Sequence, residues 1–152
     1  MPPGAATTFR ATMLGLALTL SACASSSKPM APEASVTPPP ITNPKAAPDE
    51  ATLKTYRQWI GWARIKHPYA DSEARMYAVM MCESGGRAAI VNPVGPYTGL
   101  FQYAKGTWNG AWNTYSGDAM TDAKAQIFAT ALAWSLKMQS HWGCYKKTSS
   151  AP

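Results

Sequence analysis

Charged residues are scarce in this 152-residue chain, and their distribution excludes one class of partner. Only 14% of the residues are Asp, Glu, Lys or Arg, with eight acidic against fourteen basic residues and a formal net charge of +6. A basic protein attracts polyanions such as nucleic acid, anionic lipid or an acidic cell-wall polymer. The basic residues are scattered singly, however, and Lys146-Lys147 is the only adjacent pair. Without a block of positive charge, the sequence indicates no nucleic-acid partner.

Metal-binding and phosphate-binding patterns are absent from the sequence. The chain has two histidines and three cysteines, which stand too far apart for the ligand spacing of a zinc site. No glycine-rich phosphate loop, no Ser-His-Asp set and no internal repeat is present. We therefore expect no metal and no cofactor. His67, before Pro68 at a helix end, and His141 are expected to be structural.

The longest apolar run is too short to cross a bilayer as a mature helix. It covers Ala11 to Leu20 and follows Arg10, and small residues lead from it to Cys23. This order is typical of a secretory signal peptide, here residues 1–22. The residues from Leu20 to Cys23 also resemble the bacterial lipobox, which implies a lipidated Cys23 and a membrane anchor; an ordinary signal peptide is the alternative. Ala24 resembles the sorting pattern for the outer membrane, facing the periplasm, if the host is Gram-negative.

A proline-rich linker follows the predicted lipidation site, over residues 23–49. Seven prolines and almost no large apolar side chains occur between Ala24 and Asp49, so this segment cannot bury enough surface to fold. In extended polyproline II form it would reach roughly 80 Å, at ~3.1 Å per residue. We expect one folded domain over residues 50–147 and a disordered tail over residues 148–152.

Helical periodicity dominates the predicted domain, so its expected fold class is all-α. A first helix is predicted over Glu50–His67, ending at Pro68. A second is predicted to begin after Asp71 or Ser72 and to stop at Gly85-Gly86. The expected buried face of the first helix is Tyr56, Trp59, Ile60 and Ala63, and that of the second is Ala74, Tyr77, Ala78 and Met81.

The remainder of the domain is predicted as a long loop and two more helices. The loop covers residues 87–103, and its length is typical of a functional segment. A helix is expected over Ala104–Tyr115, followed by a turn and a last helix capped by Thr121 that runs to about His141. The expected apolar side of that last helix carries Ile127, Phe128, Ala131, Leu132, Trp134, Leu136, Met138 and Trp142. No strand is predicted.

Cys82 and Cys144 form an even pair once Cys23 is set aside. Export would place them in an oxidising compartment, where such a pair is usually joined. A loop of this length predicts a stabilisation of roughly 4 kcal/mol at most in the chain-entropy model. Two buried free thiols are the alternative.

Glu83 occupies an unusual position for one of so few carboxylates. It follows an apolar turn, Val79 to Met81, and precedes Gly85-Gly86. A carboxyl group that is partly withdrawn from water holds its proton more firmly, which suits a general acid. The two glycines let the backbone leave the helix close to a ligand. A surface carboxylate at a helix end is the alternative.

Four short segments around Glu83 resemble one enzyme family. They are Glu83-Ser84-Gly85-Gly86, Val91-Asn92-Pro93, Gly99-Leu100-Phe101-Gln102 and Thr107-Trp108. In this order and spacing they resemble the lytic transglycosylase domain, which is related to goose-type lysozyme. The clear resemblance covers residues 76–112. It implies a lysozyme-like fold that cleaves the β-1,4 bond from N-acetylmuramic acid to N-acetylglucosamine in peptidoglycan.

The resemblance also implies a mechanism with a single carboxylate. Glu83 would protonate the glycosidic oxygen and then take the proton of the muramic C6 hydroxyl, which attacks C1 and forms a 1,6-anhydro ring. A hydrolytic lysozyme, the alternative, uses two carboxylates. Asp118 is the candidate for a second one, because Asp71, Glu73 and Asp122 look like first-turn residues of helices. A non-catalytic peptidoglycan-binding lipoprotein is a further alternative.

The family pattern assigns roles to other residues. Ser84 would orient the substrate or the carboxyl group, or instead bond a carbonyl at the helix end. Gln102 would close the substrate site on a loop shaped by Gly99, Leu100 and Phe101. The aromatic residues predicted to contact sugars, or otherwise to pack, are Tyr97, Tyr103 and Tyr145, with Trp108 or Trp112 at the cleft edge. The sequence departs from the family at Arg87-Ala88-Ala89, Pro96 and Thr98. Local wall remodelling for an envelope-spanning machine is the expected setting.

Overall fold

A computed structural model describes residues 46–150, all of which belong to one compact unit. The predicted signal peptide, the lipidation site at Cys23, the linker up to residue 45 and residues 151–152 lie outside the described residues and stay predictions. Among the described residues, Asp49 caps the first helix and Thr148 caps the last. In this part of the chain, no helix has the length and apolarity needed to cross a membrane.

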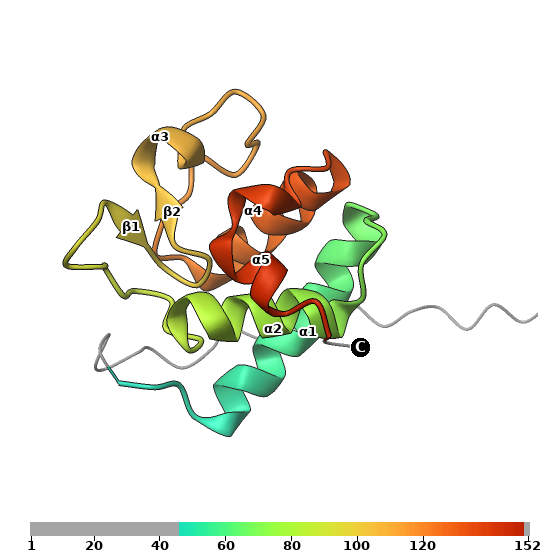
Figure 1. The fold of residues 1–152 in the computed structure, drawn as a ribbon, viewed down its shortest axis with the longest axis horizontal. Coiled ribbons are helices and arrows are strands. Elements are labelled where there is room, and N and C mark those ends of the chain that lie inside the picture. Colours follow the sequence, from blue (N-terminus) through green and yellow to red (C-terminus); the bar gives the residue numbers. More distant parts are fainter. Residues whose placement is uncertain (1–45, 151–152) are drawn as a thin grey trace, which may run out of the picture. The chain divides into compact units, whose positions relative to one another are not determined.

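The fold is mainly helical, with one small antiparallel sheet (Figure 1). In chain order the elements are α1 (Glu50–Lys66), α2 (Glu73–Ser84), β1 (Tyr97–Thr98), β2 (Tyr103–Ala104), α3 (Lys105–Trp108), α4 (Ala123–Ser135), the 3-10 helix η1 (Gln139–His141) and α5 (Gly143–Lys147). The helical class predicted from the sequence is confirmed. The expected absence of strands is wrong, because Tyr97 pairs with Ala104 and Thr98 with Tyr103.

Local capping signals define both ends of α2 and the start of α1. The Asp49 side chain accepts a hydrogen bond from Thr52 N at 2.8 Å. Hydrogen bonding to the Thr52 side chain, and then to its backbone N–H, lowers the pKa of the Asp49 carboxyl group. Ser72 accepts from Arg75 N at 3.0 Å, so Ser72 rather than Asp71 caps α2. Gly85 ends α2 with φ +64°, a left-handed conformation that suits glycine.

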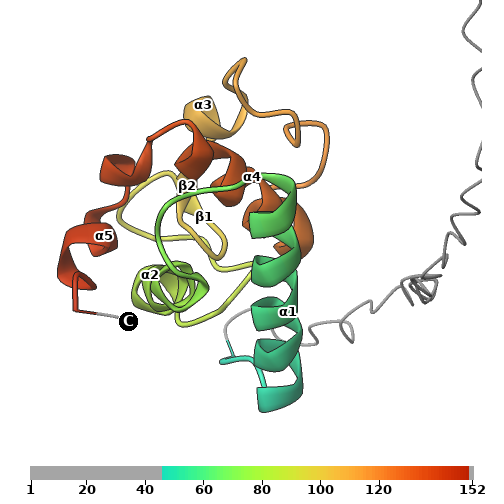
Figure 2. The ribbon, with the colours of Figure 1, turned by 90° about the vertical axis from the view of Figure 1, so that its right-hand side faces the viewer.

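The core is aromatic and lies where α1, α2, α4 and the hairpin meet. Viewed along α2 (Figure 2), α1 and α5 lie on opposite sides of that helix, with α4 and the strands above it. The predicted buried face of α1 is confirmed. The aromatic side chains of the core are Tyr56, Trp59, Tyr69, Phe101, Tyr103, Trp108, Trp134 and Trp142.

The predicted buried face of α2 is wrong. Met76, Val79 and Met80 are fully buried, whereas Ala74 is exposed and Tyr77 only partly buried. Both sets have helical spacing and both are apolar, so periodicity alone could not choose between them. The elements that pack around α2 determine which of its two apolar faces is buried.

The two C-terminal helices are shorter than predicted. α3 covers one turn, Asp122 rather than Thr121 caps α4, and α4 ends at Ser135. Lys137 then takes φ +65°, which stops the helix and leaves Leu136 exposed. After this turn the indole N–H of Trp142 donates to Phe101 O at 2.9 Å. A continuous helix to His141 is therefore replaced by a chain reversal that packs Trp142 into the core.

Two buried tyrosines predict opposite effects of removing a hydroxyl group. Tyr56 is fully buried and its hydroxyl has no hydrogen-bond partner among residues 46–150, whereas the Tyr103 hydroxyl lies 2.9 Å from Thr130 Oγ1. We expect Tyr56→Phe to raise the free energy of unfolding by about 1 kcal/mol and Tyr103→Phe to lower it by about 1 kcal/mol. Urea unfolding near neutral pH measures both. A change of the same sign in the two variants would contradict the assignment.

The buried phenols also predict a loss of stability in alkali. Burial, aided by the Asp122 and Asp49 carboxylates, raises the pKa of Tyr56 to about 12, and burial raises the pKa of Tyr69 and Tyr103 as well. The folded state then holds protons that the unfolded state releases near pH 10. This stabilisation is complete below about pH 10 and is lost as the pH rises through about 12. Urea midpoints across this range should fall, and Tyr56→Phe should reduce the fall.

Candidate active site

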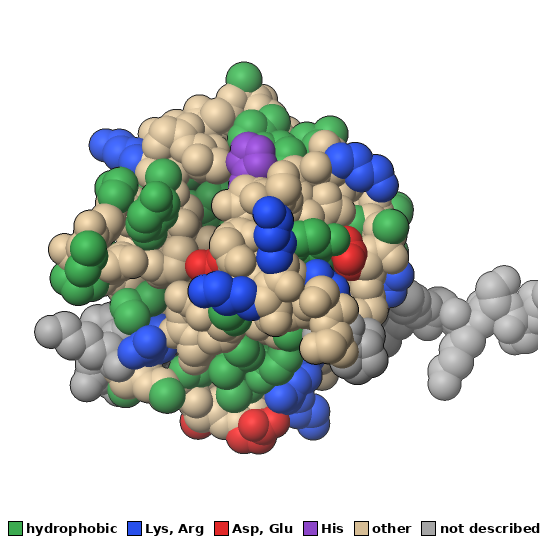
Figure 3. All heavy atoms as spheres, in the orientation of Figure 1, with side chains coloured by type: hydrophobic (Ala, Val, Ile, Leu, Met, Phe, Trp, Pro, Cys, Tyr) green, Lys and Arg blue, Asp and Glu red, His purple; other side chains and the backbone are tan. Residues whose placement is uncertain are grey.

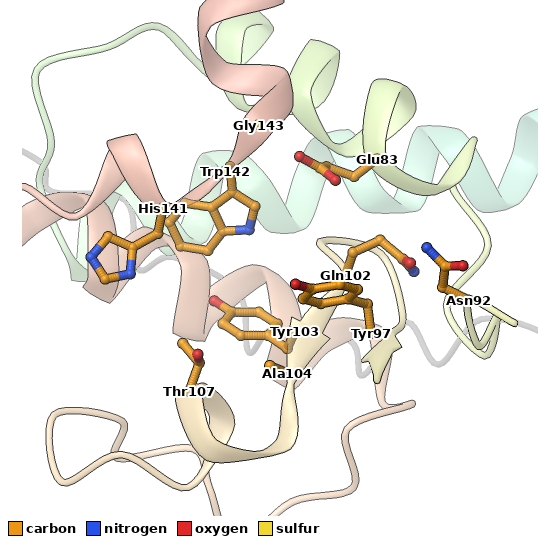
Figure 4. Close-up of a pocket in the computed structure, with 10 residues that line it drawn as sticks. All are labelled: Glu83, Asn92, Tyr97, Gln102, Tyr103, Ala104, Thr107, His141, Trp142 and Gly143. Atoms are coloured by element: carbon orange, nitrogen blue, oxygen red, sulfur yellow. The ribbon is translucent and has the colours of Figure 1, made fainter. Parts of the chain in front are cut away.

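A cleft of about 500 Å³ lies where the end of α2 meets the hairpin and the start of α5. Figure 4 shows its ten lining residues, which come from α2, the following loop, β1, β2, α3, η1 and the start of α5. They are Glu83, Asn92, Tyr97, Gln102, Tyr103, Ala104, Thr107, His141, Trp142 and Gly143. The cleft thus joins segments from both halves of the described chain.

Glu83 is the only carboxylate among these ten residues. It lies in the last turn of α2, and its carboxylate points toward Trp142 and Gly143 (Figure 4). The backbone N–H of Cys144 donates to Glu83 Oε1 at 3.0 Å. Cys82, beside Glu83, forms a disulfide with Cys144, which confirms the predicted pairing. Two adjacent residues of α2 are therefore attached to the same residue of α5.

Gln102 lies on the opposite side of the cleft from α5, in a strained turn. Its φ is +49°, and its side-chain Nε2 donates to Gly99 O at 2.9 Å. Gly99 itself has φ +85° and packs directly against the side-chain amide of Gln126. Gln126 in turn donates to Ala88 O at 3.1 Å. The buried Gln126 therefore supports the loop that carries Gln102.

The three predicted sugar-contacting tyrosines have different environments. Tyr97 lines the cleft with 44% of its surface exposed, so its ring is free to contact a ligand. Tyr103 also lines the cleft, but it is buried between the edges of Trp108 and Trp142. Tyr145 does not line the cleft. Its hydroxyl donates to Asp71 Oδ1 at 3.1 Å.

Three other predicted site residues are buried beside the cleft and do not line it. The Ser84 hydroxyl donates to Met80 O at 3.2 Å and accepts from Gly86 N, so the helix-end alternative describes it. Leu100 and Phe101 are fully buried, and Phe101 meets the edge of Trp142. These residues shape the site through packing.

None of the other carboxylates considered from the sequence lines the cleft. Asp118 is exposed, and its backbone oxygen accepts from Trp108 Nε1. Asp71 accepts from Tyr145, Glu73 lies 3.9 Å from Arg64, and Asp122 caps α4. The structure therefore gives Glu83 no acidic partner among the lining residues.

Sequence reasoning missed part of the cleft. Asn92 and Thr107 were included in the quoted motifs without a role, so a signal for them existed. His141 and Trp142 were placed in a continuous helix, and no local signal identified them. Trp142 lines the cleft in place of the expected Trp108 or Trp112, and His141 lines it as well.

The chemical groups available at the cleft and the surface charge indicate which kinds of ligand the cleft suits. Among the described residues, no group of three His, Cys, Asp or Glu side chains could hold a metal ion. Lys and Arg side chains are scattered over the face seen in Figure 3 and form no block there. The lining combines one carboxylate with amide, hydroxyl and aromatic groups. Such a lining offers hydrogen bonds and aromatic ring faces to a polar ligand, with one carboxyl group beside it.

Comparisons of the chain with protein-family models, curated proteins and solved structures found no match.

Gly99 provides a test of how the cleft loop is held. Its φ is +85° and an added Cβ would overlap the Gln126 amide, so we expect Gly99→Ala to lower the free energy of unfolding by about 1–3 kcal/mol. Gly117→Ala is the matched control, since no atom lies within 4 Å of its added Cβ, and should change stability by less than about 0.5 kcal/mol. Chemical denaturation measures the free energy of unfolding of the two variants and of the wild-type protein. Equal stabilities would mean that Gly99 is not constrained by Gln126.

Proposed function

We propose that the chain is a peptidoglycan lytic transglycosylase with a lysozyme-like fold, and that Glu83 is its only catalytic residue. One observation carries the proposal: a single carboxylate, fixed at Oε1 by Cys144 N–H, lies in a cleft of about 500 Å³ that contains no second acid. The four segments that resemble the family support it. Each of the four supplies one lining residue, namely Glu83, Asn92, Gln102 and Thr107.

The proposed reaction needs one proton donor and no water. Glu83 first gives its proton to the oxygen between muramic acid and glucosamine, and the bond from that oxygen to muramic C1 breaks. The ionised Glu83 then accepts the proton of the muramic C6 hydroxyl as its oxygen bonds to C1. The products are a 1,6-anhydromuramic end and a free glucosamine hydroxyl. Glu83 ends the cycle protonated, as it began.

The lining favours this reaction over hydrolysis. A hydrolytic glycosidase places a second carboxylate about 5–5.5 Å or about 6.5–9.5 Å from the acid. Asp71, Asp118 and Asp122 are absent from the cleft. Gln102, Asn92 and Tyr97 instead offer hydrogen bonds and a ring face to a glycan strand. They would hold the strand with the scissile oxygen near Glu83.

The proposed setting is the periplasmic cell wall. The predicted lipid at Cys23 and the extended linker would let the domain work at a distance from the outer membrane. The small size of the domain suits local opening of the wall for an envelope-spanning machine. A non-catalytic domain that only binds peptidoglycan would use the same cleft.

Digestion of purified cell-wall sacculi tests the reaction and Glu83 together. We expect wild-type protein to release fragments with 1,6-anhydro ends, measured by mass spectrometry. Glu83→Gln removes the proton donor and should lower the rate by about 100-fold or more. Glu73→Gln is the matched control, because Glu73 is on the same helix but outside the cleft.

The products separate the alternatives. Fragments that carry an added water would make the protein a hydrolytic lysozyme. Binding to sacculi without soluble fragments would make it a non-catalytic binding domain. Undiminished release by Glu83→Gln would remove Glu83 from the mechanism.

A further inference from the structure

Two attachments of different kind meet at Cys144, beside the candidate catalytic residue. Its sulfur is bonded to Cys82, and its backbone N–H donates to Glu83 Oε1 at 3.0 Å. Cys82 and Glu83 are neighbours in the last turn of α2. The covalent bond therefore restrains the separation between the N–H donor and the carboxylate that accepts from it.

The Cys144 N–H is available for this bond because of its place in α5. It belongs to the first turn of a short helix, where backbone N–H groups have no partner within the helix. Among residues 46–150, the bond from Cys144 is the only hydrogen bond recorded for the Glu83 carboxylate. Orientation of that carboxylate thus depends on where α5 begins.

A separate set of contacts holds the following residue of α5. Arg75 donates to Tyr145 O at 2.6 Å and lies over the Tyr145 ring at 4.5 Å. Tyr145 also donates to Asp71 at the start of α2. These contacts do not involve the disulfide, so α5 has an attachment that survives its reduction. Loss of the disulfide should loosen the segment at Glu83 without detaching α5.

We propose that Cys144 is a positioning residue for Glu83, and that the Cys82–Cys144 disulfide keeps its N–H against the carboxylate. This inference rests on the proposed function for its effect on rate, but the geometry it assigns can be tested without any activity. Cys82 is exposed, so a reductant can reach the disulfide from that side. Catalysis in this site would then be several-fold faster in the oxidised protein than in the reduced one.

Amide hydrogen exchange tests the positioning directly. Dithiothreitol transfers two electrons and two protons to the disulfide, giving two thiols and its own cyclic disulfide. We expect the Cys144 amide to exchange about tenfold faster or more after reduction, and likewise in oxidised Glu83→Ala protein. The Tyr145 amide, which donates to Trp142 O, should change less and serves as the internal control. An unchanged Cys144 rate in both cases would overturn the proposal.

Two disulfide-free variants separate the hydrogen bond from the covalent bond. Cys82→Ser with Cys144→Ala keeps the N–H, whereas Cys82→Ser with Cys144→Pro removes it; proline is tolerated in the first turn of a helix. We expect kcat on sacculi to fall several-fold in the first and roughly ten- to hundredfold further in the second, with KM little changed, since misplacing a catalytic group acts on kcat. Circular dichroism and melting curves check that both variants fold.

The two proposals fail in different ways. Equal kcat values for the alanine and proline variants, both folded, would overturn the positioning role while wild-type activity stands. If wild-type protein released no fragment, the proposed function would be contradicted. The amide exchange rates would still test whether Cys144 positions Glu83.

Discussion

The attachment of α5 to the end of α2 is the constraint on which the cleft depends. Without it, Glu83 would be a carboxylate at the end of a helix facing solvent. The disulfide and the Cys144 N–H bring η1, Trp142 and Gly143 across from the hairpin, so that the end of α2 becomes one wall of a cleft. The chain reversal at Lys137 makes this possible, because it turns the last segment back toward α2.

The opposite wall depends on a second buried group, the Gln126 side chain of α4. Its amide contacts Gly99, where any larger residue would collide, and donates to Ala88 O on the loop after α2. α4 can approach this closely because its other buried positions are mostly alanine. The two walls are thus held by different elements, one through a covalent bond and one through packing. Glu83 and Gln102 face a common space only because both are in place.

The sequence predicted those features whose signals are local. The buried face of α1 and the glycine end of α2 follow from periodicity and from residues with special backbone freedom. The Cys82–Cys144 pair followed from cysteine count and predicted export. The buried face of α2 could not be predicted, because Met76 and Val79 compete with Tyr77 and Met81 and only the neighbours decide. No glycine or proline marks the end of α4 at Ser135, so the sequence did not predict that His141 and Trp142 line the cleft. Glu83 and Gln102, which both line the cleft, were singled out from the sequence because of the short motifs that contain them.

The net charge of the chain and the single carboxylate in the cleft have different effects. Under the proposed function, the +6 net charge of the full chain would draw it toward an acidic wall polymer, but such attraction is screened beyond about 8–10 Å in physiological salt. This attraction would therefore speed the encounter with the polymer but would not select one sugar over another. Within the cleft Glu83 is the only Asp, Glu, Lys or Arg among the lining residues, so under the proposed function amide, hydroxyl and ring groups would recognise the sugars. Glu83 is the only carboxylate among the lining residues. Under the proposed function, its proton would pass to one oxygen of the substrate and be replaced from another. Scarcity of acidic residues thus agrees with a reaction that uses one.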